Sequence, residues 1–181
     1  MKIAVLNDTH CGIRNSSEVF LDNAEKFYNE VFFPECEKQD IKQILHLGDY
    51  YDHRKFVNFK ALNHNRRVFL DQLRKRGMSM DIIPGNHDTY YKNTNELNSL
   101  KECLGHYMNE VNIVMEPKVM KYGSLNVGLV PWICNDNYEQ CMNFIRDCKA
   151  DWIGAHLELK GFEMMRGPVS YTHLTLPTKC W

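Results

Sequence analysis

Four short segments of the sequence place carboxylate, imidazole and amide side chains directly after apolar runs. They are DTH at 8–10, GDYYDH at 48–53, GNHD at 85–88 and GAHLE at 154–158. One such segment could be an ordinary turn, because Gly, Asn and Asp are common turn residues. Four of them together favour a metal or catalytic site, since clusters of His, Asp and Glu are typical of such sites.

The residue types in these segments suit a pair of metal ions. Asp8 and His10 stand two apart, and on an extended segment this spacing points both side chains to one side. Asp49 has two oxygens and can bridge two cations, Asn86 offers an amide oxygen, and His156 offers an imidazole nitrogen. Mixed nitrogen and oxygen ligands with open positions favour manganese, iron or zinc over calcium. Two such ions about 3.5–4 Å apart can hold the attacking and leaving oxygens of a displacement at phosphorus.

His87 lies beside an expected ligand without having to be a ligand itself. It can act as a general acid and donate a proton to the leaving alkoxide. Asp88 can accept a hydrogen bond from the other ring nitrogen of His87 and so fix its tautomer. We therefore expect His87 and Asp88 to form the catalytic pair beside the metal ligands.

The hydrophobic pattern predicts the elements that bring these segments together. Strands are expected at 2–7, 41–47, 80–84 and 151–156, and shorter strands in hairpin-like succession at 112–115, 118–123 and 124–132. Helices are expected at 16–38, 58–76, 94–104 and 137–149. This alternation is typical of an α/β layered domain with a mixed sheet. In such sheets ligands bind outside the carboxyl ends of the strands, where the four polar segments would meet.

Length and composition predict one soluble globular domain. The chain has 181 residues, of which 44% are hydrophobic and 25% charged. Its apolar runs are far shorter than the roughly 20 residues of a membrane span, and its N-terminus lacks the pattern of a signal peptide. The seven cysteines include no CxxC pair, which favours a reducing compartment. We therefore expect a cytoplasmic protein without a membrane partner.

Two further patterns have two interpretations each. Cys134, Cys141 and Cys148 recur every seven residues, as small apolar side chains around a helix would, whereas structural zinc usually needs a paired spacing that is missing. Residues 54–76 hold eight Lys or Arg against one acid. Such a basic stretch can follow the phosphates of a nucleic acid, or it can be the solvated face of a helix.

The order and spacing of DxH, GDxxD, GNHD and the later strand-end His resemble the calcineurin-like metallophosphoesterases. The blocks GDYYDHRK, GNHDTYYKN, LVPWICNDN and AHLELKGFEMMRG narrow the resemblance to the SbcD/Mre-type DNA repair nucleases, among them the recombination endonuclease subunits of large tailed phages. The resemblance covers about residues 1–167. It implies a metallophosphoesterase β-sandwich flanked by helices, and an enzyme that hydrolyses phosphodiester bonds of DNA in recombination and double-strand-break processing.

The same resemblance implies site residues and partners. The family's ligands fall on Asp8, His10, Asp49, Asn86 and His156, and its catalytic histidine falls on His87. Many cellular members carry a second functional histidine where this chain has Asp52, with His53 beside it. Two divalent metal ions are implied, manganese first and iron or zinc as alternatives. The implied partners are DNA, an SbcC-like SMC-type ATPase and a second copy of the chain, in the host cytoplasm if a phage encodes it.

The sequence departs from the family pattern near its end. The family supplies two more ligands from a GHxH motif on a later strand, and this chain has no such motif. His173 lacks the paired geometry of a substitute ligand. From about Pro168 the residues PVSYTHLTLPTKCW resemble translated vector read-through. We therefore expect residues 1–167 to be a nuclease domain that is incomplete at its C-terminus, and residues 168–181 to be a non-native tail.

Three functions stay open at this point. The first is a manganese-dependent DNA exonuclease or endonuclease, and the basic stretch together with the PWICNDN and HLELKGF blocks favours it. The second is another metallophosphoesterase that acts on proteins or small molecules. The third is a catalytically incomplete fragment or scaffold, because the GHxH ligands are absent.

Overall fold

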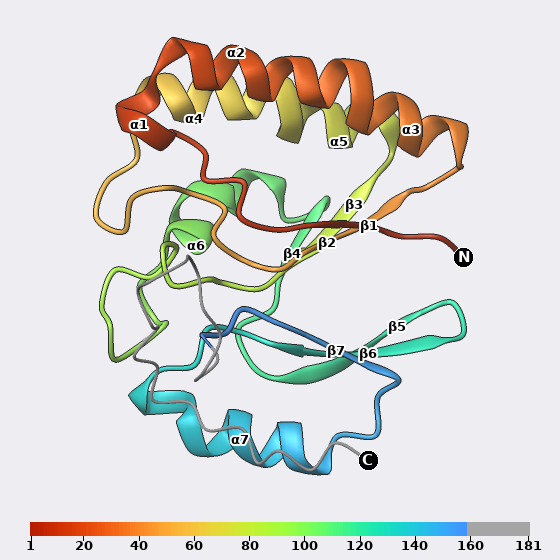
Figure 1. The fold of residues 1–181 in the computed structure, drawn as a ribbon, viewed down its shortest axis with the longest axis vertical. Helices are drawn as coiled ribbons and strands as arrows, with labels where there is room; N and C mark the ends of the chain where they lie inside the picture. The colour runs from red at the N-terminus through yellow and green to blue at the C-terminus, as the bar shows by residue number, and fades with distance from the viewer. Residues whose placement is uncertain (159–181) are drawn as a thin grey trace, which may run out of the picture.

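Two β-sheets lie face to face, with the long helices over one of them and α7 (Tyr138–Asp147) under the other (Figure 1). The structure is a computed structural model and describes residues 1–158. The α/β layered fold expected from the sequence is confirmed, and so is the β-sandwich flanked by helices. The expected boundary between residues 167 and 168 lies outside the described residues.

The first sheet is parallel throughout and has the order β1-β2-β3-β4. Its strands are β1 (Ala4–Leu6), β2 (Gln43–His46), β3 (Ser79–Ile82) and β4 (Val111–Ile113). Helices cover one face of this sheet and the second sheet covers the other, so the strands place apolar side chains on both faces. On β2, Ile44 packs under the helices and Leu45 packs toward the second sheet.

The second sheet is mixed and has the order β5-β6-β7. Its strands are β5 (Lys118–Tyr122), β6 (Leu125–Val130) and β7 (Trp152–Ala155). β5 and β6 form the expected hairpin, with Gly123 at a φ of 65° in the turn, and β7 runs parallel to β6. This second sheet is the mixed sheet expected from the sequence, but the expected place of β4 in its hairpin-like succession is wrong. β4 does not begin a meander, because the crossover through α6 (Ser99–Leu104) brings it back parallel to β3 in the first sheet.

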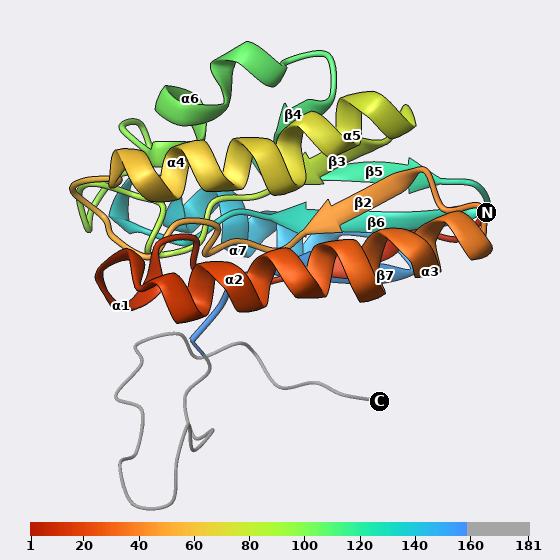
Figure 2. The same cartoon turned by 90° about the horizontal axis from the view of Figure 1, so that it is seen from above.

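The long helices predicted from the sequence are present as continuous helical runs. The first comprises α2 (Glu18–Lys26), a π-helical segment (Phe27–Phe32) and α3 (Phe33–Lys38), preceded by the short α1 (Ile13–Ser16). The second comprises α4 (Phe59–Asn65), a π-helical segment (Arg66–Leu70) and α5 (Asp71–Arg76). Figures 1 and 2 show the two runs side by side over the first sheet.

The remaining helices are shorter than the sequence predicted. α6 begins only at Ser99, because the side chain of Asn98 caps it by accepting from the backbone N–H of Lys101, and Gly105–Tyr107 continues it as a 3-10 turn. α7 (Tyr138–Asp147) follows a 3-10 turn at Asn135–Asn137 and covers the outer face of the second sheet. Within residues 1–158, no helix combines the length and apolar character needed to cross a membrane.

A buried carboxylate connects the two sheets. Asp81 on β3 accepts hydrogen bonds from the Tyr122 hydroxyl at 2.9 Å, from Asn112 Nδ2 at 2.6 Å and from Gln43 Nε2 at 2.8 Å. Burying a carboxylate is costly unless it is hydrogen-bonded, and three donors meet this requirement here. The contact between Asp81 and Tyr122 therefore fixes β5 against β3.

We expect the Tyr122→Phe variant to unfold with a free energy about 1–3 kcal/mol lower than that of the parent, because a buried acceptor loses one donor while the ring packing is kept. Urea denaturation followed by circular dichroism measures the difference. Tyr138→Phe is the matched control, since Tyr138 is 41% exposed. Equal unfolding free energies for Tyr122→Phe and the parent would contradict the role assigned to this contact.

Candidate metal centre

The loops that follow β1, β2 and β3 converge on one another at the carboxyl ends of the strands. The backbone N–H of Asp8 donates to the Gly48 carbonyl at 3.1 Å, and the N–H of His10 donates to the Asp49 carbonyl at 3.0 Å. The N–H of His87 donates to Asp49 Oδ1 at 2.8 Å. The expected meeting of these segments at one rim of the sheet is therefore present in the structure.

The residue at position 85 is glycine for a steric reason and not because the backbone turns there. A Cβ on Gly85 would collide with Oδ1 and the backbone nitrogen of Asp49. Gly48 lies in the loop after β2 and has a φ of 97°. A Cβ on Gly48 would lie 2.7 Å from the Gly85 nitrogen and 2.9 Å from His156 Nδ1. Both glycines therefore let two loops approach more closely than any side chain would allow.

Three of the expected ligands have left-handed backbone conformations. Asp8, His10 and Asp49 have φ angles of 52°, 41° and 54°. The sequence interpretation placed Asp8 and His10 on an extended segment, and that part is wrong. Their side chains still meet, with His10 Nε2 at 3.7 Å from Asp8 Oδ1. Non-glycine residues in such conformations cost about 1–3 kcal/mol each and cluster at functional sites.

Asp49 lies at the centre of the candidate site. Its carboxylate is 4% exposed, with Oδ2 at 3.6 Å from His10 Nε2 and Oδ1 at 3.5 Å from His156 Nε2. Two groups of side chains place their ligand atoms within 4.8 Å of one another: His10, Asp49 and His87 form one, and Asp8, Asp49 and His156 form the other. Asp49 belongs to both groups, which is the position a bridging carboxylate would have.

The surroundings of His156 fit a cation. Its Nδ1 donates to the Leu47 carbonyl at 2.9 Å, so in the neutral ring Nε2 carries a lone pair. That nitrogen faces Asn86 Oδ1 at 3.0 Å and Asp49 Oδ1 at 3.5 Å. Acceptor atoms that converge in this way are stabilised by a positive ion between them. The donor set of nitrogen, amide oxygen and carboxylate oxygen is one that divalent transition metals accept.

Asp52 holds the ring of His87, where the sequence predicted Asp88. The backbone carbonyl of Asp52 accepts from His87 Nδ1 at 2.6 Å, which leaves Nε2 of His87 available for chemistry. The Asp52 carboxylate lies 3.4 Å from His10 Nδ1 and 3.4 Å from His53 Nε2. Asp52 thus contacts both a candidate ligand and the candidate acid.

Asp88 has a different task from the one expected. Its side chain is fully buried and accepts from three backbone N–H groups, those of Gly85 at 2.9 Å, Tyr50 at 3.0 Å and Tyr51 at 3.1 Å. Burial raises the pKa of Asp88 to about 6, against the lowering effect of these hydrogen bonds. Asp88 therefore fixes the GNHD loop to the loop that follows β2.

His46 is a residue that the sequence interpretation missed. It ends β2 and is fully buried. It hydrogen-bonds to Thr9 in the loop after β1 and to Gly48 in the loop after β2. Burial lowers its pKa to about 3, so the ring is neutral. A histidine inside the apolar run IKQILHL gave no separate signal, because its partners are distant in sequence or lie in the backbone.

The structure favours one interpretation of the cysteine spacing and one interpretation of the basic stretch at residues 54–76. Cys141 is fully buried against Val130 and Met142, and neither group of candidate metal ligands within residues 1–158 contains a cysteine, which favours the apolar interpretation. In the basic stretch, four cations pair with acids: Lys60 with Glu18, Arg67 with Glu25, Arg74 with Glu110 and Arg76 with Glu37. These four favour the solvated helix face. His173 lies outside the described residues.

The chain is similar to proteins of a known family. The family model described as calcineurin-like phosphoesterase matches residues 1–161. The chain is 28% identical over 175 residues to exonuclease subunit 1 of Enterobacteria phage T4, with 94% of this chain and 50% of that protein covered. It thus spans about half the length of that relative. The crystal structure of Pseudomonas putida nuclease MPE superposes with a TM-score of 0.44 and 18% identity, covering 70% of this chain and 52% of the other.

Proposed function

This chain belongs to the calcineurin-like phosphoesterase family, and from that premise we propose that it is the nuclease domain of a DNA exonuclease or endonuclease subunit. The observation that carries the proposal is the carboxylate of Asp49, which belongs to two groups of ligand atoms, one of which includes His87. The relative that carries the name exonuclease subunit 1 supports DNA as the substrate. The proposed reaction is hydrolysis of phosphodiester bonds during recombination and break processing.

Two divalent cations, when bound, would polarise the phosphodiester and lower the pKa of a water molecule. In the proposal, Asp8 and His10 hold one ion, Asn86 and His156 hold the other, and Asp49 serves both. Manganese is the proposed metal from the family resemblance, and iron or zinc are the alternatives because they accept the same mixed nitrogen and oxygen ligands. The carboxylate, imidazole and amide side chains that would bind these ions come from four separate segments of the chain.

His87 is the proposed general acid. Its Nδ1 donates to the Asp52 carbonyl, so Nε2 carries a proton only in the protonated, cationic ring, and from that form His87 can pass the Nε2 proton to the leaving alkoxide and become neutral. Asp52 orients the ring through its backbone, and Asp88 holds the loop through three backbone N–H groups. In this proposal Asp88 is a positioning residue rather than the direct partner of His87.

The proposal includes partners and a location. The name of the phage relative describes a subunit, which supports a partner protein for this chain as well. We assign that role to an SbcC-like ATPase and add a second copy of the chain, both from the family resemblance. The host cytoplasm is the proposed location if a phage encodes the chain. The division into a nuclease domain at 1–167 and a tail at 168–181 belongs to the same proposal.

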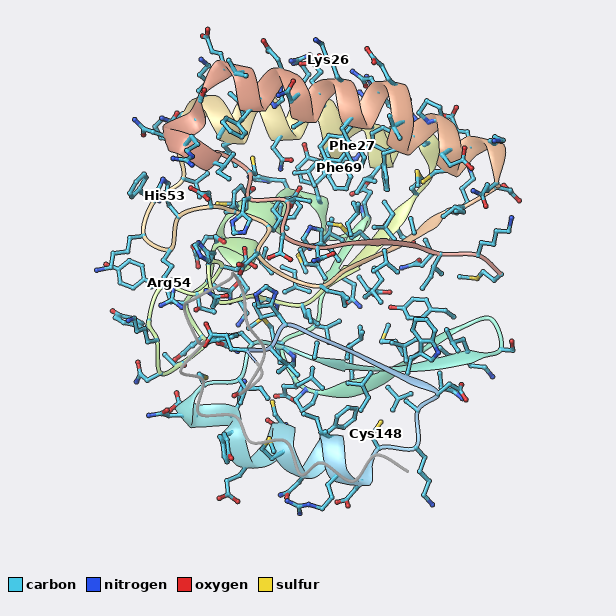
Figure 3. All side chains as sticks on the ribbon, in the orientation of Figure 1. Lys26, Phe27, His53, Arg54, Phe69 and Cys148 are labelled. Atoms are coloured by element: carbon cyan, nitrogen blue, oxygen red, sulfur yellow. The ribbon has the colours of Figure 1, made fainter. Side chains whose placement is uncertain are left out.

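Two basic residues next to the site support a DNA substrate. Arg54 and Lys55 follow His53, whose Nε2 lies 3.4 Å from the Asp52 carboxylate. Figure 3 shows His53 and Arg54 on the loop that leaves β2 toward α4. Lys55 lies over the ring of Tyr90, with 5.7 Å between Nζ and the ring centroid. This loop therefore carries positive charge to the margin of the candidate site.

We expect the double variant Arg54→Gln, Lys55→Gln to bind DNA more weakly and to lower the slope of log K against log salt by about 2, close to one unit per lost phosphate contact. Fluorescence anisotropy at several salt concentrations measures the slope. The matched control is Arg67→Gln, Arg74→Gln, which removes the same charge from residues paired with Glu25 and Glu110. Equal slopes for the two double variants would contradict the proposal that Arg54 and Lys55 contact DNA phosphates.

The nuclease proposal is tested by cleavage of end-labelled DNA with and without Mn²⁺. Chelator-sensitive cleavage that the Asp49→Asn variant lacks would support it. Hydrolysis of a phosphopeptide or a small phosphate ester without DNA cleavage would favour another metallophosphoesterase. Calorimetric metal binding without any hydrolysis would favour the catalytically incomplete domain, the interpretation based on the missing GHxH motif.

A further inference from the structure

A buried histidine joins the two loops that carry three of the candidate ligands. His46 ends β2, and its side chain lies between the loop after β1 and the loop after β2. The backbone N–H of Gly48 donates to His46 Nδ1 at 3.2 Å, and His46 Nε2 lies 3.0 Å from Thr9 Oγ1. The Thr9 hydroxyl in turn donates to the Tyr50 carbonyl at 3.3 Å.

These contacts define one tautomer of the ring. Because Nδ1 accepts from a backbone N–H, it carries the lone pair, and the proton of the neutral ring is on Nε2. Nε2 therefore donates to Thr9 Oγ1, which still has its own hydrogen to give to the Tyr50 carbonyl. Hydrogen bonds thus run without conflict from Gly48 through His46 and Thr9 to Tyr50.

The hydrogen-bonded relay formed by Gly48, His46, Thr9 and Tyr50 has members that stand next to candidate ligands in the sequence. Thr9 separates Asp8 from His10, and Asp49 lies between Gly48 and Tyr50. Each of these three ligands has a left-handed φ, between 41° and 54°. Such conformations persist only when the surrounding structure holds them in place. The relay is in the position to do so, because it is anchored on the residues that flank the strained ones.

We propose that His46 is a positioning residue that sets the separation between the loop of Asp8 and His10 and the loop of Asp49. The inference rests on the proposed function in that it takes these residues as metal ligands. His46 itself acts through Thr9 and Gly48 and has no role in the chemistry. Losing the relay lets the loops move apart, so that a cation no longer meets ligands from both of them.

The test uses the 181-residue chain and three variants. Thr9→Val keeps the side-chain shape but removes the hydroxyl, Thr9→Ser restores it, and His46→Phe removes both ring contacts. The first measurement is amide hydrogen exchange in metal-free protein at Asp8 and His10, whose N–H groups cross between the loops. The second is calorimetric titration with Mn²⁺, together with the melting temperature in chelator.

For Thr9→Val we expect faster exchange at these amides and Mn²⁺ affinity about 10–100-fold lower, the usual effect of losing a group that orients metal ligands. Thr9→Ser is expected to behave like the parent. His46→Phe is expected to follow Thr9→Val, with a larger loss in melting temperature because the Gly48 N–H loses its acceptor.

Unchanged exchange and unchanged affinity in Thr9→Val would overturn the inference. So would a lower melting temperature with full Mn²⁺ affinity, because it would mean that the relay supports only the general fold. If the parent binds no Mn²⁺, the metal part of the proposed function fails. The positioning role is then decided by the exchange rates alone, and equal rates in the parent and Thr9→Val overturn it.

Discussion

We expect the Asp49→Asn variant to lose affinity for Mn²⁺ at two sites, whereas His10→Ala loses it at one. The carboxylate of Asp49 lies 3.6 Å from His10 Nε2 through one oxygen and 3.5 Å from His156 Nε2 through the other. An amide carries no charge and offers a single acceptor oxygen, so both ions would lose attraction. The loss is expected to exceed the roughly 10–100-fold effect of a substitution outside the direct ligands.

Calorimetric titration of both variants measures the number of sites and their affinities. Asp71→Asn is a suitable control, because Asp71 lies on α5 and accepts from the Tyr107 hydroxyl at 2.7 Å rather than from residues of the candidate site. If Asp49→Asn and His10→Ala lose equal affinity at a single site, Asp49 does not bridge. The two-metal arrangement would then have to be abandoned.

The second large effect is expected at His87. The His87→Ala variant is predicted to keep its metal content and to hydrolyse DNA roughly 10²–10⁴-fold more slowly, the usual contribution of a general acid. The ring is held by the Asp52 carbonyl through Nδ1, so the reactive position is Nε2. Turnover of end-labelled DNA, normalised to metal content measured by atomic emission, tests this prediction.

The same experiment distinguishes the proposed acid role of His87 from a role as a metal ligand. His87 also belongs to the ligand group of His10 and Asp49, so it could bind a metal instead of donating a proton. Loss of metal in parallel with loss of activity would establish that role and contradict the assignment as acid. His106→Ala serves as the control, since this exposed histidine lies in the 3-10 turn after α6.

Local sequence determined most of the secondary structure and the types of residue at the site. The apolar runs that became β1, β2 and β3 are each followed by Asp, His or Asn, and the loops after them meet as the sequence predicted. Gly77 ends α5 with a φ of 57°, as expected for a glycine at a helix terminus. These features depend on residues only a few positions apart, so hydrophobic periodicity and local backbone preferences are sufficient to predict them.

Tertiary structure alone decided which groups contact one another. Asp88 is next to His87 in the sequence but is committed to the N–H groups of Tyr50 and Tyr51, so Asp52 takes its expected place. Arg67, in the basic stretch, is paired with Glu25, a partner 42 residues away.

The same holds for the sheets and for the strained ligands. β4 joins β3 because of its crossover, although its own residues suit a hairpin equally well. Asp8, His10 and Asp49 are left-handed because hydrogen bonds between loops hold them so, against their local preference. The partners of strands and of charged side chains, and the left-handed conformations, depend on how distant segments pack together. A pattern of neighbouring residues does not describe that packing.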